Sequence, residues 1–235
     1  MKRTRVVLLL AALCFVLGVN GFAADNAYLY LVHGIPGRDI ADNINPGYPV
    51  DVLIDGECVV RGLTYDNTSG PLSFAPGTYS VQISESNSLA ACTNATVIDS
   101  TVTLSAGASV SAVAALSGGQ PALLTFTDNL TPVTPGNARF VFANSADAPA
   151  LQVTLTQLFV KNPQTFTATA KPNAQAVITL PYGTYSVTVA AAGSTTVLAS
   201  EQETLPNQSA TFTYAAGQAA NNSVGLVNRT VRDVF

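Results

Sequence analysis

Residues 76–81 read PGTYSV, and residues 182–187 read YGTYSV, 106 positions further along the chain. Within and after the first copy, Tyr79, Val81 and Ile83 are apolar, and the residues between them are polar. An alternation of period two predicts a β-strand with one buried face. A repeat period near 100 residues indicates a duplicated domain rather than a solenoid, whose repeats are about 20–50 residues long. The sequence therefore predicts two related β-domains.

Segments around the repeat also correspond. Residues 52–54 match residues 153–155, and residues 101–104 match residues 203–205. Asp55-Gly56 separates two strand-like runs and favours a hairpin with a type I′ turn, in which both central residues take positive φ. Many short strands with Gly and Pro turns, and no long amphipathic helix, predict an all-β fold. We expect two tandem immunoglobulin-like antiparallel β-sandwich domains.

The first 23 residues have the pattern of a secretory signal peptide. Residues 1–5 form a basic segment, residues 6–19 are apolar, and Gly21 and Ala23 provide small residues at the −3 and −1 positions of a cleavage site. The alternative of a membrane anchor would need about 20 apolar residues. A lipid anchor at Cys14 is disfavoured, because the large Leu13 precedes it. We predict an exported protein that is secreted, periplasmic or at the cell surface, with no membrane span after cleavage.

Removal of the signal peptide leaves a first domain, residues 24–133, and a second domain, residues 134–235, with a Pro-rich linker at residues 131–136. The remaining chain has 7 Lys and Arg against 14 Asp and Glu, a net charge of −7. The first domain holds 10 of the acids and two of the bases. This acidic surplus disfavours nucleic acids and anionic membranes as partners.

Two cysteines remain after export, Cys58 and Cys92. An even number of cysteines in an oxidising compartment predicts a disulfide between them. A reactive thiol pair would need a nearby cation to lower a thiol pKa, but Glu57 stands beside Cys58. We therefore predict a structural disulfide.

The only histidine is His33, so any Ser-His-Asp or Cys-His arrangement would have to use it. It follows a strand-like run and precedes a Gly-rich turn, where an imidazole that caps local backbone is the favoured interpretation. The sequence has no G-x-S-x-G motif, no phosphate-binding loop and no Cys/His metal spacing. We predict no enzyme, no catalytic residue, no metal and no cofactor.

Two ligand-binding alternatives stay open. Calcium binds six to eight oxygen atoms, and the first domain gathers carboxylates and amides in one region: Asp39, Asp42, Asn43, Asn45, Asp51, Asp55 and Glu57. Glycan-binding surfaces commonly expose aromatic rings, and the candidates here are Tyr48, Tyr65 and Tyr182, which form no stripe. The spacing of the acids matches no EF-hand loop, so a solvated acidic loop is the favoured interpretation.

An ordered set of motifs resembles a known bacterial family. The motifs are HGIPG at residues 33–37, PVDVLIDG at 49–56, APGTY at 75–79, NSADAPA at 144–150 and LPYGTY at 180–185. Together they resemble the bacterial domain of unknown function 4397 family over nearly the whole exported chain. The resemblance implies secreted or cell-surface tandem β-sandwich domains with no established activity.

The chain departs from the family pattern in two places. Residues 38–48 look like an insertion before the first hairpin, and the second domain lacks the Asp-Gly turn, so its hairpin should be longer or frayed. Tyr79 and Tyr185 are predicted to be ordinary core aromatics, with a tyrosine-corner contact as the alternative.

Architecture and exclusion together predict the function. We expect a non-catalytic secreted or cell-envelope structural or interaction protein, whose partner is an unidentified envelope protein or glycan. An extracellular module that binds a glycan or calcium is the alternative, and a hydrolase ranks third.

Overall fold

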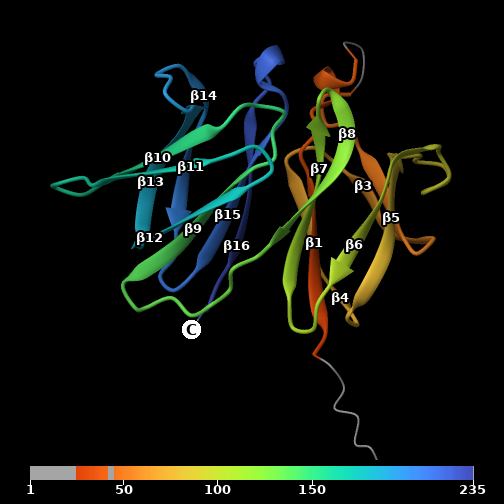
Figure 1. Ribbon diagram of the computed structural model, residues 1–235, viewed down its shortest axis with the longest axis horizontal. Coiled ribbons are helices and arrows are strands. Elements are labelled where there is room, and N and C mark those ends of the chain that lie inside the picture. The colour runs from red at the N-terminus through yellow and green to blue at the C-terminus, as the bar shows by residue number, and fades with distance from the viewer. Residues whose placement is uncertain (1–24, 42–44, 235) are drawn as a thin grey trace, which may run out of the picture.

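The segments with period-two alternation form β-strands in the structure. The computed structural model describes residues 25–41 and 45–234, and these residues form sixteen β-strands and two short 3-10 helices. The strands assemble into two sandwich units, one before and one after the segment that follows β8 (Figure 1). The predicted signal peptide lies outside the described residues. In the described part, no helix has the length and apolar character needed to cross a membrane.

Unit 1 comprises β1 (Ala27–His33), β2 (Val50–Ile54), β3 (Glu57–Leu63), β4 (Asn67–Phe74), β5 (Gly77–Glu85), β6 (Thr96–Leu104), β7 (Ser109–Ser117) and β8 (Gln120–Thr127), with a 3-10 helix η1 (Gly37–Asp39). Its sheets have the strand orders β4-β1-β7-β8 and β3-β2-β5-β6.

Unit 2 repeats this topology strand for strand. It comprises β9 (Asn137–Asn144), β10 (Leu151–Gln157), β11 (Thr165–Ala170), β12 (Gln175–Pro181), β13 (Gly183–Ala191), β14 (Val197–Leu205), β15 (Ala210–Ala216) and β16 (Gly225–Val231), with a 3-10 helix η2 (Ala219–Asn221). Its sheets have the orders β12-β9-β15-β16 and β11-β10-β13-β14.

One strand pair in each unit differs from the predicted antiparallel arrangement. β1 pairs with β7 in parallel, and β9 pairs with β15 in parallel. A parallel pair needs a long connection, and here the chain makes it by passing through the other sheet between β1 and β7. The predicted all-β fold of two sandwiches is confirmed, and within it these two pairs are parallel where antiparallel pairing was expected.

The predicted turn chemistry is present in unit 1. Asp55 has φ of 50° and Gly56 has φ of 80°, as a type I′ turn requires between β2 and β3. In unit 2 the connection between β10 and β11 spans residues 158–164 and is longer, as the missing Asp-Gly dipeptide predicts.

Both repeat tyrosines make the tyrosine-corner contact that was the less favoured alternative. The Tyr79 hydroxyl donates to the carbonyl of Ala75 (2.7 Å), and the Tyr185 hydroxyl donates to the carbonyl of Pro181 (2.6 Å). Each ring packs against its unit's core while its hydroxyl ties the strand to the turn that precedes it. The prediction of ordinary core aromatics therefore omits the hydrogen bond that each tyrosine hydroxyl makes.

The four sheets stack as four layers (Figure 1). We call β4-β1-β7-β8 and β12-β9-β15-β16 the inner sheets and the other two the outer sheets. One apolar cluster fills each sandwich between its outer and inner sheets. A third cluster, here named the interface core, lies between the two inner sheets: Val32, Val113, Ala115, Phe126, Val133, Val141, Ala143, Ala210, Phe212, Tyr214, Ala216, Val227 and Val234.

Small side chains allow the two inner sheets to pack closely. β7 and β15 are buried on both faces, and alanine is frequent in both strands. At the edge of the contact, a Cβ on Gly34 would lie only 3.2 Å from the Cβ of Ala216. The amide of Gly217 donates to the carbonyl of Gly34 at 3.0 Å and joins the units directly.

Candidate functional site

A buried ion pair crosses the interface core. Arg229 on β16 places its Nη2 atom 2.8 Å from Oδ2 of Asp128, which follows β8 in the other unit. Both side chains are almost fully buried. Asp128 also accepts hydrogen bonds from the hydroxyls of Ser109 (2.7 Å) and Ser111 (2.8 Å) on β7. The carboxylate is therefore ion-paired and hydrogen-bonded inside the contact.

The guanidinium of Arg229 lies between two aromatic rings, one from each unit. Its Cζ atom is 3.6 Å from the ring centre of Tyr30 on β1 and 4.3 Å from that of Phe212 on β15. Nη2 also donates to Oγ of Ser111 at 3.0 Å, and the Tyr214 hydroxyl donates to the same oxygen at 2.6 Å. Cation–π contacts of this kind are strongest where water is excluded.

Polar loop residues also form hydrogen bonds between the two units. Oδ1 and Oδ2 of Asp39, in η1, accept hydrogen bonds from Asn221 and Ser223 of unit 2. In the opposite direction, Asp147 of unit 2 accepts from the amide of Gly119 at 2.7 Å. Asp39 is thus a contact between the units.

His33 is buried and both of its ring nitrogens face backbone groups. Nε2 lies 2.6 Å from the carbonyl of Tyr48, and Nδ1 accepts from the amide of Ile35 at 3.3 Å. Burial lowers the pKa of His33 to about 4, against a weaker raising effect of the Tyr48 hydrogen bond. The imidazole is neutral at pH 7 and holds the inserted segment onto β1, in agreement with its predicted capping role.

Asp51 organises the outer sheet of unit 1. Oδ1 accepts from the amide of Gly62 (2.8 Å) and the hydroxyl of Ser86 (2.7 Å), and Oδ2 accepts from the amides of Cys92 (2.7 Å) and Asn87 (3.3 Å). Burial raises the pKa of this carboxyl, but the four hydrogen bonds outweigh burial and leave the pKa below its ordinary value. Beside it, the disulfide between Cys58 and Cys92 ties the β5–β6 loop to β3.

We predict that Asp51→Asn lowers the free energy of unfolding by about 2 kcal/mol, because an amide nitrogen would face buried donors. Since the folded-state pKa of Asp51 is lowered, its stabilisation is complete above the ordinary Asp pKa and disappears as the pH falls through the folded-state value. The difference in unfolding free energy between wild type and Asp51→Asn should therefore disappear below about pH 4. Urea unfolding at several pH values measures it, with the exposed Asp99→Asn as the matched control.

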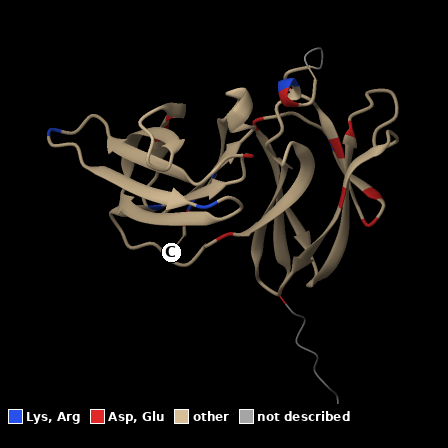
Figure 2. Ribbon diagram, turned by 45° about the horizontal axis from the view of Figure 1, so that its top comes forward, with Lys and Arg blue, Asp and Glu red and all other residues tan. Residues whose placement is uncertain are grey.

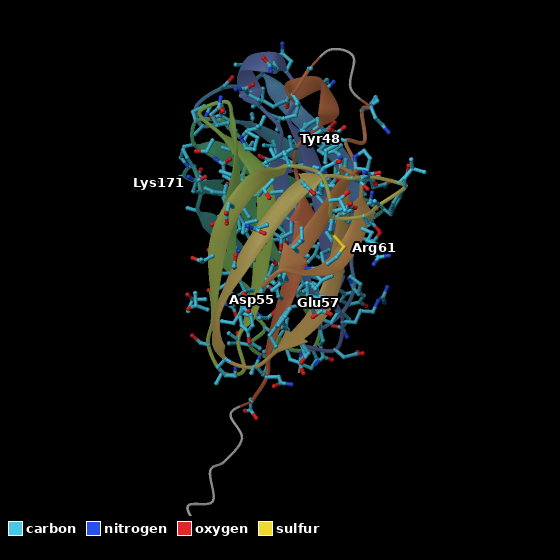
Figure 3. All side chains as sticks on the ribbon, turned by 90° about the vertical axis from the view of Figure 1, so that its right-hand side faces the viewer. Tyr48, Asp55, Glu57, Arg61 and Lys171 are labelled. Carbon is cyan, nitrogen blue, oxygen red and sulfur yellow. A yellow bond between two sulfur atoms is a disulfide. The ribbon has the colours of Figure 1, made fainter. Side chains whose placement is uncertain are left out.

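The candidate calcium ligands do not converge among the described residues. The carboxylate of Asp51 accepts hydrogen bonds from backbone amides, and that of Asp39 accepts from unit 2. Oδ1 of Asp55 accepts from the amide of Ser80. Figure 3 shows Asp55 and Glu57 together at the β2–β3 turn, away from Tyr48. Within residues 25–41 and 45–234, no three His, Cys, Asp or Glu side chains form a group that could hold a metal. Asp42 and Asn43 lie outside the described residues.

The candidate sugar-binding tyrosines also fail to gather. Tyr48 is buried, Tyr65 is half-buried against Gly225 of unit 2, and Tyr182 is exposed on unit 2. An open groove of about 330 Å³ lies instead between the facing parts of β3 and β4. Its lining is mostly polar and includes no aromatic ring: Val60, Arg61, Gly62, Leu63, Thr64, Asn67, Thr68 and Ser69.

Sequence reasoning missed the groups that cross the interface. Arg229 and Asp128 received no role, although a cation at a core-facing position of an apolar strand (GLVNRTV) marks a buried charge that needs a partner. The ion pair, the interface core and the loop contacts together form the structurally distinctive site of this protein.

Comparisons with known proteins give a family but no activity. The family model described as "Domain of unknown function (DUF4397)" matches residues 27–154, from the start of β1 into β10. No curated protein matches the chain. A solved structure described as a candidate cell adhesion protein from Bacteroides ovatus is 8% identical with a TM-score of 0.28, and the match covers 90% of this chain and 98% of that one.

A second solved structure from Bacteroides ovatus, described as a candidate adhesin, is 12% identical with a TM-score of 0.25; the match covers 91% of this chain and 97% of that one. The family model covers more than half of the 235 residues and contains the HGIPG, PVDVLIDG and APGTY motifs. The chain therefore belongs to the domain of unknown function 4397 (DUF4397) family.

Proposed function

We propose that this chain is a non-catalytic interaction protein of the cell exterior, built as one rigid body from two domains at residues 24–133 and 134–235. The observation that carries the proposal is the interface core with its buried Arg229–Asp128 pair. Most pairs of domains within a chain share polar contacts and move against each other. A shared apolar core removes that freedom, so loops on the two units are held at a fixed spacing.

Two further features support this role. The only histidine is buried against backbone groups, so a catalytic arrangement based on His33 has no accessible imidazole. The Cys58–Cys92 disulfide suits an oxidising compartment outside the cytoplasm. Loops carried by rigid sheets are a common way to present binding surfaces.

Site-directed photo-crosslinking in the producing cells tests the proposal. A photoreactive amino acid is placed at Leu89 or Phe159, both on loop tips, and at the control positions Thr101 or Thr167, both exposed on outer sheets. We expect discrete adducts from the tip positions and weaker ones from the controls. Equal labelling at all four positions, or none, would contradict an interaction role for the loops.

The groove between β3 and β4 favours a second candidate function, the binding of a small polar ligand such as a glycan. Its volume is at the lower end of the range for small-molecule pockets. Arg61 offers the only cation in the lining. An oligosaccharide array probed with wild type and with Arg61→Ala tests this function: hits that the substitution removes support it, and an empty array contradicts it.

A further inference from the structure

Two loops mark opposite ends of the four-layer stack. The β5–β6 loop, residues 86–95, extends beyond the outer sheet of unit 1, and the β10–β11 loop, residues 158–164, extends beyond the outer sheet of unit 2 (Figure 1). Because the interface core fixes the units, the two loops face away from each other. They cannot meet within one molecule.

Each loop exposes apolar side chains. Leu89 is 97% exposed and Phe159 is 86% exposed, and these are the two most exposed large apolar side chains in the described part of the chain. Val97, which follows the first loop at the start of β6, and Val160 in the second are also exposed. Burial of these side chains against a partner would remove apolar surface from water, which favours association.

Both loops are held in place rather than left free. Phe159 has φ of 61°, a left-handed conformation that is strained for a bulky side chain. The base of its loop is closed by Gln157, whose amide donates to the carbonyl of Gln164 and whose Oε1 accepts from the amide of Gln164. Such ordering lowers the entropic cost of binding.

The β5–β6 loop is ordered by its own network. Oδ1 of Asn87 accepts from the amides of Leu89 (3.0 Å) and Ala90 (3.2 Å). Asp51 and the Cys58–Cys92 disulfide fix the same loop to the sheet below. Leu89 is therefore presented by a pre-formed turn.

The two ends carry opposite charge. Lys161 follows Phe159 and Val160 in the β10–β11 loop and is exposed. On the β5–β6 hairpin, Asp99 is exposed on the outer face, where Gln82 donates to its carboxylate, and the acidic residues lie mostly in unit 1 (Figure 2). One end thus combines apolar side chains with a cation, and the other combines apolar side chains with a carboxylate.

We propose that the β10–β11 tip of one copy docks on the β5–β6 hairpin of a second copy, head to tail. This inference rests on the proposed interaction role and names the partner. Phe159 would pack on Leu89, and Lys161 would face Asp99 on the outer face of the hairpin. An anionic membrane is a poorer occupant for the tip, because the single lysine of this loop adds only about 1 kcal/mol of attraction to such a surface.

The contact uses two different surfaces, so each bound copy still offers one free tip and one free hairpin. A contact of this heterologous kind adds further copies and builds open chains unless its rotation closes a ring. The mass of the assembly should therefore rise continuously with protein concentration, and added salt should weaken the contact by screening its charges.

Sedimentation of the protein purified after export tests the proposal with two variants, Phe159→Asp and Leu89→Asp. Both change exposed side chains, and circular dichroism with thermal melting checks that each variant folds. We expect each variant alone to remain monomeric, with self-association at least about tenfold weaker than in wild type. An equimolar mixture should form a 1:1 dimer and stop there, because one intact tip still meets one intact hairpin.

Charge reversal gives a second readout. Lys161→Glu should weaken association, and adding Asp99→Lys to the same chain should restore it. If wild type stays monomeric at about 1 mM, or if the mixed variants fail to pair, the head-to-tail contact is wrong. Photo-crosslinks from Leu89 or Phe159 to a different macromolecule would then still support the interaction role. The absence of such crosslinks would contradict both the head-to-tail contact and the interaction role.

Discussion

Replacing Arg229 by leucine is expected to lower the free energy of unfolding by about 3–5 kcal/mol, because it leaves the carboxylate of Asp128 buried without its cation. Asp128 would keep only the two serine hydroxyls as donors. The rings of Tyr30 and Phe212 would also lose the guanidinium that lies between them. Urea-induced unfolding measures the change.

The exposed Arg232 provides the matched control for this prediction. Arg232→Leu removes the same type of side chain three residues away and should change stability by less than about 0.5 kcal/mol. In a double-mutant cycle with Asp128→Asn, the sum of the two single losses in unfolding free energy should exceed the loss in the double variant by more than about 1 kcal/mol. A small effect of Arg229→Leu, equal to that of Arg232→Leu, would mean that the ion pair does not hold the units together.

Acidification from pH 7 to pH 4 is expected to remove about 3 kcal/mol of stability through His33 alone. Burial lowers the folded-state pKa of His33 from 6.5 to about 4. Between these values the unfolded chain binds a proton that the folded chain excludes. The stabilisation is therefore complete above pH 6.5 and falls as the pH drops toward 4.

His33→Asn is the variant that separates this effect from other titrations. Asn144 occupies the corresponding place on β9 and bonds the carbonyls of Pro149 and Ala170 through its side-chain nitrogen, so an amide suits this position in the fold. The stability of the variant should be about 3 kcal/mol less sensitive to pH between 7 and 4 than that of wild type.

Two half-buried carboxyls act in the opposite direction and make the comparison necessary. Burial raises the pKa values of Glu201 and Glu203 on β14, so these groups favour the folded state as the pH falls. Subtracting the variant's pH profile from that of wild type cancels their contribution. Parallel profiles from pH 7 to pH 4 would show that His33 does not titrate as its burial requires.

The sequence predicts local structure well where a single strand or turn decides it. The alternation around Tyr79 and Tyr185 produces β5 and β13, and Asp55-Gly56 produces the predicted turn. These features depend on side-chain period and on allowed φ angles, which a short segment contains in full. The duplication of strand order follows from the same repeat.

The interface core was out of reach of that reasoning because it depends on pairing between distant segments. The β7 segment SVSAVAALS contains a continuous run of small and apolar residues rather than a clean alternation. Such a run is typical of a strand buried on both faces, so it could have indicated that a second layer covers β7. It does not say which sheet covers the second face, so Arg229 and Asp128 could not be matched.

The candidate calcium ligands that the structure describes do not converge, for a related reason. Carboxylates close in sequence were assumed to have free oxygens. In the fold, the oxygens of Asp51 are occupied by main-chain amides of other segments, and Asp39 binds loops of unit 2. Whether a carboxylate is free depends on which backbone donors come near it, and that is decided by tertiary contacts.

The distance between the two outer sheets tests most directly whether the two sandwiches form one rigid body. Spin labels at Thr101 on β6 and Thr167 on β11, both exposed, report this distance by pulsed electron spin resonance with the native disulfide intact. A fixed interface predicts one narrow distance distribution in wild type and a broader one in Arg229→Leu. A broad or multi-peaked distribution in wild type would contradict the rigid four-layer body.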